Sequence, residues 1–154
     1  MDNPIIIALD FKNRIEVEKF LADFQDEKLF LKVGMELFYR EGAAMIKALK
    51  KAGHQIFLDL KCHDIPHTVA QAMKQLSELE VDMVNVHAAG GSEMMKQAKK
   101  AFGSQGKMIA VTQLTSITET MLEQEQLVTA GMQASVKNYA QLTQESGLDG
   151  VVCS

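Results

Sequence analysis

Long apolar segments are absent from this sequence, which nowhere contains about 18 consecutive apolar residues, the length that a transmembrane helix needs. The apolar run at residues 4–9 is too short for the core of a signal peptide and has no basic flank. We therefore expect neither export nor insertion into a membrane, and we expect the protein to lie in the cytoplasm.

Cysteine and excess positive charge are also scarce. The two cysteines, Cys62 and Cys153, are far apart and form no CxxC pair, so both are predicted to be free thiols. The 16 basic residues are outnumbered by 20 acidic ones, which argues against nucleic acid as a partner. With 47% hydrophobic residues, the sequence suits one globular domain over residues 1–154.

The most informative stretch, residues 59–66, directly follows the apolar run at residues 56–58. If that run is a β-strand, its alternation directs Asp59 and Lys61 to the same face, so that an acid and an amine are neighbours at the end of the strand. An isolated pair of this kind is most simply a salt bridge, which is worth under about 1 kcal/mol when exposed.

A second carboxylate, Asp64, is out of phase with that face. It lies just before Pro66, which disfavours regular structure at the preceding residue, so Asp64 is predicted to belong to a loop. A loop residue can reach its own site or the site of a partner. Cys62 points away from the acid and the amine, so we expect no nucleophilic role for its thiol.

Short aliphatic strands alternate with helices along the whole sequence. Strands are expected at residues 5–10, 28–33, 54–61, 82–86, 107–112 and 147–153. Helices are expected at 13–24 with Asn13 as the N-cap, at 37–52, at 68–79, at 92–102 with Ser92 as the N-cap, and, as one or two helices, within 118–146. This order is typical of βαβ units and a parallel sheet. Both an open doubly wound sheet and a (β/α)8 barrel fit it.

The polar residues at the strand ends favour one of these two architectures. A doubly wound sheet gathers its ligand groups at one switch point, whereas a barrel enzyme takes them from the carboxyl ends of several strands. In this sequence each of the first five strands ends in polar residues opposite its aliphatic face: Asp10, Lys32, Asp59 and Lys61, Asn85 and His87, and Thr112. We therefore predict an α/β fold, a (β/α)8 TIM barrel, of which this chain holds about the first five βα units plus strand six.

Five segments, in order and with barrel spacing, match a known family. They are residues 8–10 (ALD), 31–34 (LKVG), 57–66 (FLDLKCHDIP), 84–88 (VNVHA) and 111–116 (VTQLTS). Together they resemble the orotidine 5′-phosphate decarboxylases of bacterial type. A related group of magnesium-dependent sugar-phosphate decarboxylases and aldolases shares the Asp-x-Lys-x-x-Asp pattern. That group carries a carboxylate at the position of Lys32, so the lysine favours the orotidylate enzymes.

The resemblance implies a reaction and the residues that perform it. The expected reaction is decarboxylation of orotidine 5′-phosphate to UMP in pyrimidine biosynthesis, without metal or other cofactor. Lys61 resembles the lysine that stabilises and protonates the C6 carbanion, and Asp59 the carboxylate that faces the substrate carboxylate. Lys32 resembles the link between that carboxylate and the ribose, Asp10 a ribose ligand, and Thr115 the pyrimidine contact.

The resemblance also implies a homodimer with shared sites. Asp64, which belongs to the catalytic set, and the substrate-binding residues Ile65 and Thr68 match positions that enter the neighbouring subunit's site. His67 departs from the family, which usually has asparagine there, and this puts a detail of the subunit boundary in doubt.

Two other interpretations remain open: a magnesium-dependent lyase that uses Asp59, Asp64 and His87, and a non-catalytic fragment or interaction module. A (β/α)8 barrel typically needs about 250 residues, and the family's phosphate-binding Gly-Arg is absent from the sequence. We therefore expect roughly 70 to 80 further residues after Ser154, estimated from the size of such barrels, and the phosphate-binding residues among them.

Overall fold

The computed structural model describes residues 5–24 and 27–153, and these form one parallel sheet with the strand order β1-β2-β3-β4-β5-β6. The strands are β1 (Ile7–Ala8), β2 (Phe30–Gly34), β3 (Gln55–Cys62), β4 (Met83–His87), β5 (Lys107–Val111) and β6 (Gly150–Val152). A doubly wound sheet reverses its strand order at the switch point, and this sheet does not. The sequential order confirms the predicted barrel topology.

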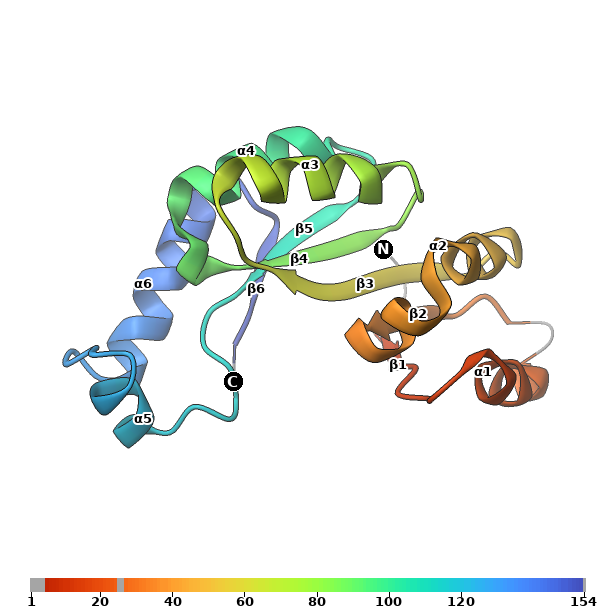
Figure 1. Ribbon diagram of the computed structural model, residues 1–154, viewed down its shortest axis with the longest axis horizontal. Helices are drawn as coiled ribbons and strands as arrows, with labels where there is room; N and C mark the ends of the chain where they lie inside the picture. The colour runs from red at the N-terminus through yellow and green to blue at the C-terminus, as the bar shows by residue number, and fades with distance from the viewer. Residues whose placement is uncertain (1–4, 25–26, 154) are drawn as a thin grey trace.

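The helices connect the strands, and most of them surround the sheet, whereas α5 lies away from it near one end of α6 (Figure 1). They are α1 (Arg14–Leu21), α2 (Met35–Lys51), α3 (Pro66–Ser77), α4 (Gly91–Phe102), α5 (Glu119–Gln124) and α6 (Met132–Glu145), with short 3₁₀ turns η1 (Ala22–Phe24) and η2 (Ala88–Gly90). In the part of the chain that the structure describes, no helix has both the length and the apolar character that crossing a membrane requires.

The predicted start is correct for one of the helices α1, α3 and α4, and the structure corrects the other two. Asn13 caps α1 as predicted, because its side chain accepts a hydrogen bond from the Glu16 backbone N–H at 3.0 Å. Ser92 is not a cap, which corrects the prediction. The turn η2 continues directly into α4, so Ser92 lies inside the first turn of that helix. The α3 helix begins at Pro66, two residues before the predicted start, because proline suits the first position of a helix.

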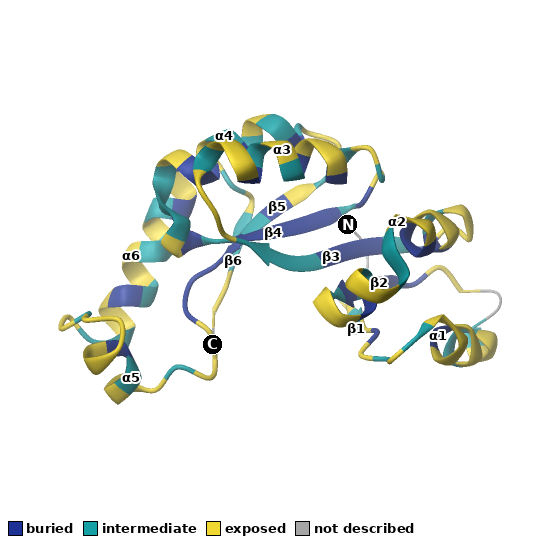
Figure 2. Ribbon diagram, in the orientation of Figure 1, coloured by how far each residue is buried: buried dark blue, intermediate teal, exposed yellow. Residues whose placement is uncertain are grey.

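Side chains alternate across the strands and form two separate apolar clusters. The larger cluster packs the outer strand face against the helices and includes Ile56 and Leu58. The smaller cluster joins Phe30, Phe57 and Met83 on the opposite, inner face. Figure 2 shows the buried colour along the central strands. Because side chains alternate along a strand, Asp59 lies on the same inner face of β3 as Phe57.

Two aspartates at the start of strands fix the amino ends of their neighbours in the same way. Asp82, before β4, accepts from the Ile56 backbone N–H at 2.7 Å and from Lys50 at 2.6 Å. Asp149, two strands later, accepts from the Met108 backbone N–H at 2.7 Å and from Lys99 at 2.5 Å. The repeated arrangement sets the register of β3 and β5, and hence where their carboxyl ends lie.

Candidate active site

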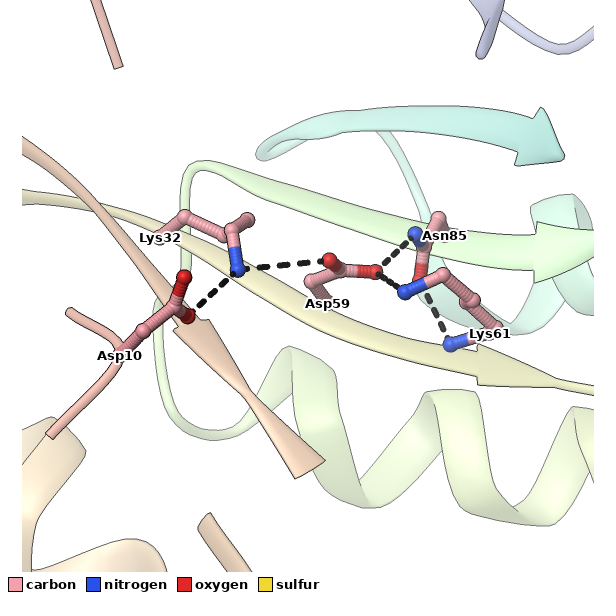
Figure 3. A network of polar contacts seen from close by, with 5 residues as sticks. All are labelled: Asp10, Lys32, Asp59, Lys61 and Asn85. Carbon is pink, nitrogen blue, oxygen red and sulfur yellow. Dashed lines mark hydrogen bonds and ion pairs between the residues drawn. The ribbon is translucent and has the colours of Figure 1, made fainter. Parts of the chain in front are cut away.

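Four charged side chains alternate in sign at the carboxyl ends of β1, β2 and β3 (Figure 3). Lys32 Nζ lies 3.3 Å from Asp10 Oδ1 and 3.7 Å from Asp59 Oδ2. Lys61 Nζ lies 2.6 Å from Asp59 Oδ1. Because consecutive parallel strands bring their carboxyl ends to one edge, residues far apart in sequence meet here. The structure thus brings together Asp10, Lys32, Asp59 and Lys61, which we call the charged array.

Asp59 is the centre of the charged array and its most buried member. Its side chain is 12% exposed, against 23% for Lys32, 32% for Lys61 and 76% for Asp10. Burial alone raises the pKa of Asp59, but hydrogen bonds from Lys61 and Asn85 and the charges of both lysines outweigh it and lower that pKa. The carboxyl group is therefore ionised at neutral pH, with an ammonium on each side.

Lys61 has an unusual backbone conformation, with φ at +49°. The pairing of β3 with β4 also shifts register between Leu58 and Cys62. A side chain other than glycine in the left-handed region is strained, and such strain persists only where the surroundings hold it. The bulge keeps Lys61 beside Asp59, while Cys62 packs against the outer core as its phase predicted.

Asn85, on β4, connects the two central residues. Its side-chain N–H donates to Asp59 Oδ1 at 2.6 Å, and its Oδ1 accepts from the Lys61 backbone N–H at 2.7 Å. The sequence predicts that Asn85 lies on the polar face of its strand but indicates no role for it. The signal was its position between two valines of a buried strand, because a buried amide needs hydrogen-bond partners.

The other four predicted site residues do not join the charged array. Asp64 is exposed, and its Oδ1 accepts from the Ile65 backbone N–H at 2.7 Å. Ile65 is 66% exposed, Thr68 is exposed in the first turn of α3, and Thr115 is exposed in the loop after β5. Across residues 5–24 and 27–153, no side-chain hydrogen bond or ion pair joins these four to the charged array.

His87 is the last residue of β4 and stacks on His63, with ring centroids 5.4 Å apart and planes 19° from parallel. Burial, the nearby His63 and the charge of Lys61 lower the pKa of His87. The ring is therefore neutral at pH 7. Across the described ranges, no group of three or more histidine, cysteine, aspartate or glutamate residues is arranged to hold a metal ion, and the trio Asp59, Asp64 and His87 forms no such group.

A pocket in the described part of the chain adjoins the charged array, and a larger hollow lies away from it. A pocket of about 220 Å³ between the ends of β1 and β2 includes Asp10 and Gly34 in its wall. A larger hollow of about 670 Å³ lies between α3 and α4, which pack outside the sheet, and none of its lining residues belongs to the charged array. Because ionisable groups of opposite sign converge in the charged array, it is the candidate active site.

Comparison with known proteins identifies the family of this chain. A family model described as "Orotidine 5′-phosphate decarboxylase / HUMPS family" matches residues 3–154. The chain is 57% identical over 162 residues to the orotidine 5′-phosphate decarboxylase of Bacillus mycoides and 58% identical over 157 residues to that of Staphylococcus epidermidis, covering 100% of this chain and 68% of each relative. The crystal structure of orotidine 5′-phosphate decarboxylase from Lactobacillus acidophilus superposes with a TM-score of 0.92 and 45% identity, over 99% of this chain and 72% of that one. These matches show that the chain belongs to the orotidine 5′-phosphate decarboxylase / HUMPS family.

Proposed function

We propose that this protein decarboxylates orotidine 5′-phosphate to UMP in the cytoplasm, as a step of pyrimidine biosynthesis, and needs no metal or other cofactor. The observation that carries the proposal is the position of Lys61, whose ammonium is held 2.6 Å from the partly buried carboxylate of Asp59 in a barrel of this family. The names of the relatives support the choice of substrate.

The difficulty of the reaction explains why a fixed ammonium is useful. When the carboxylate of orotidylate leaves C6 as CO2, the electron pair of the broken bond stays in an in-plane orbital that the ring cannot delocalise. The ammonium of Lys61, placed beside C6, stabilises this pair and then transfers a proton to C6. The resulting neutral amine regains its proton from water.

The electrostatic contribution of Lys61 can be estimated and is not sufficient alone. Two unit charges 4 Å apart at an effective dielectric constant of 20 interact by about 4 kcal/mol. Enzymes lower activation free energies by about 8 to 23 kcal/mol. We infer that the remainder comes from the charged array being fixed before substrate binds, and from binding of the remote phosphate group.

Asp59 has two roles in this proposal. Its carboxylate accepts from Lys61 Nζ and therefore orients the ammonium. It also faces the carboxylate of the substrate, and repulsion between two carboxylates disfavours the bound ground state relative to the transition state, in which one of them is leaving as CO2. Lys32, 3.7 Å from Asp59, and Asp10 are the groups we assign to the ribose.

We further propose that the active unit is a homodimer in which each subunit completes the other's site. Asp64, Ile65 and Thr68 are exposed at the start of α3 and take no part in the charged array of their own chain. Exposure of these side chains at the barrel mouth suits insertion into a partner. A symmetric dimer would place both copies of this segment in equivalent positions.

Thr115, in the loop after β5, is the residue that we propose contacts the pyrimidine of the substrate.

The reaction is tested by the change in ultraviolet absorbance as orotidine 5′-phosphate becomes UMP, measured with EDTA and with added Mg²⁺. We expect equal rates under both conditions, because the ammonium groups of Lys32 and Lys61 flank Asp59 and repel a cation there. A rate that collapses with EDTA and returns with Mg²⁺ would instead support a magnesium-dependent lyase. No change in absorbance under either condition would refute the decarboxylase assignment.

A further inference from the structure

Asn85 makes hydrogen bonds to both Lys61 and Asp59. It is 1% exposed, and its side-chain amide uses both of its ends: the N–H group donates to Asp59 and the oxygen accepts from Lys61 N–H. These bonds are 2.6 and 2.7 Å long. A buried amide that bridges two members of the proposed catalytic set does more than fill space in the barrel.

The β-ladder shows why this bridge is needed. Leu58 pairs with Val84 and Cys62 pairs with Val86, so residues 59–61 of β3 stand opposite a single residue of β4, which is Asn85. At this bulge the main chain of β4 offers no regular partner to Lys61 N–H, and the side chain of Asn85 supplies the missing acceptor. The bond therefore holds Lys61 in its left-handed conformation.

The bulge in turn determines where the ammonium lies. In a regular strand, residues i and i+2 project side by side and roughly perpendicular to the sheet. The bulge bends β3 at Lys61, so that its side chain turns back and Nζ comes within 2.6 Å of Asp59. Asn85 also donates to the same Oδ1 atom, which fixes the carboxylate toward the ammonium.

We infer that Asn85 is a positioning residue for the decarboxylation. It stabilises the bulge that sets the position of Lys61, and it orients the Asp59 carboxylate that accepts from the Lys61 ammonium. The inference rests on the proposed function for its effect on catalysis. Its structural part, the support of the Lys61 backbone, can be measured without substrate.

The test compares Asn85→Ala with Val86→Ala, a neighbour on β4 that is also buried but faces the helices. We expect Asn85→Ala to lower kcat on the order of 10²-fold, the effect of displacing a catalytic group by about 1 Å, while KM stays near its wild-type value. Exchange of the Lys61 amide hydrogen should become at least about tenfold faster, because a bond worth roughly 1.5 kcal/mol is lost. Val86→Ala should leave kcat and Lys61 exchange unchanged.

A second variant separates the two bonds and covers the case in which Asn85→Ala does not fold. Asn85→Asp keeps the acceptor for Lys61 N–H but replaces the donor with a carboxylate that repels Asp59. We expect slow Lys61 exchange in this variant together with a low kcat. The inference is overturned if folded Asn85→Ala keeps wild-type Lys61 exchange or a kcat within threefold of wild type, or if Asn85→Asp keeps wild-type kcat. A wild-type protein inactive on orotidylate would refute the proposed function, and the exchange measurement would still decide the role of Asn85 in the bulge.

Discussion

Replacing Lys61 with alanine is expected to lower kcat for orotidine 5′-phosphate by at least about 10³-fold. The ammonium is worth about 4 kcal/mol to a carbanion 4 Å away, which corresponds to roughly this factor in rate. Loss of the proton donor adds to the effect, since general acid catalysis typically contributes 10²- to 10⁴-fold. Steady-state kinetics with orotidine 5′-phosphate measure the change.

The Lys61→Ala protein should remain folded, so that the loss can be assigned to chemistry. Asp59 keeps its bond from Asn85 and the charge of Lys32, so its carboxylate is not left unpaired. Circular dichroism and thermal unfolding check this point. Lys96→Ala, which removes an exposed lysine of α4, is the matched control and should keep wild-type kcat. A Lys61→Ala protein that is folded and within tenfold of wild type would contradict the proposed mechanism.

Mixing two inactive variants, Lys61→Ala and Asp64→Ala, is expected to restore activity. If Asp64 completes the partner's site, the hybrid dimer contains one site with both defects and one site with neither. With equal mixing, half of the dimers are hybrids, so about a quarter of all sites should be intact, as follows from the two-fold symmetry of a dimer. The measurement is the rate of UMP formation after the subunits have exchanged.

Lys61→Ala mixed with Asp59→Asn provides the control for this experiment. Lys61 and Asp59 lie 2.6 Å apart on one strand, so every hybrid site carries a defect and no activity should return. Subunit exchange is followed independently with differently tagged subunits. If Lys61→Ala and Asp64→Ala exchange subunits but fail to complement each other, Asp64 acts in the site of its own chain and the shared-site proposal is wrong.

The alternation of apolar and polar residues was enough to predict the fold and much of the charged array. The inner face of β3 follows from its period of two, and consecutive parallel strands bring Asp10, Lys32 and Asp59 to one edge. These are properties of local sequence and of βαβ topology. They need no knowledge of packing detail.

The sequence predicts correctly that Lys61 lies beside Asp59, but it does not predict the bulge through which this happens. Simple alternation puts it beside Asp59, yet the actual strand bulges and Lys61 adopts a left-handed backbone there. Neither feature has a local signature, because no glycine or asparagine marks the position. The role that we infer for Asn85 depends on that bulge. The pairing of β3 with β4 reveals the bulge, and the sequence alone does not.

Ser92 and Asp64 mark two further limits of reading the sequence. Serine is a residue type that often caps helices, but the turn η2 continues directly into α4, so Ser92 lies inside the first turn of that helix. The position of Asp64 in a loop after β3 was predicted and is confirmed, whereas the shared site that we propose for it would depend on how two chains meet. Local sequence does not contain that information.

Whether a fixed ammonium stabilises negative charge at C6 is tested most directly by hydrogen exchange at C6 of UMP in D2O, followed by NMR. The wild-type protein should place deuterium at C6 without any change in the rest of the nucleotide, because the same carbanion forms when the C6 proton is removed. Lys61→Ala should not raise exchange above that of buffer. Equal exchange in both proteins, or none in the wild type, would contradict the role assigned to Lys61.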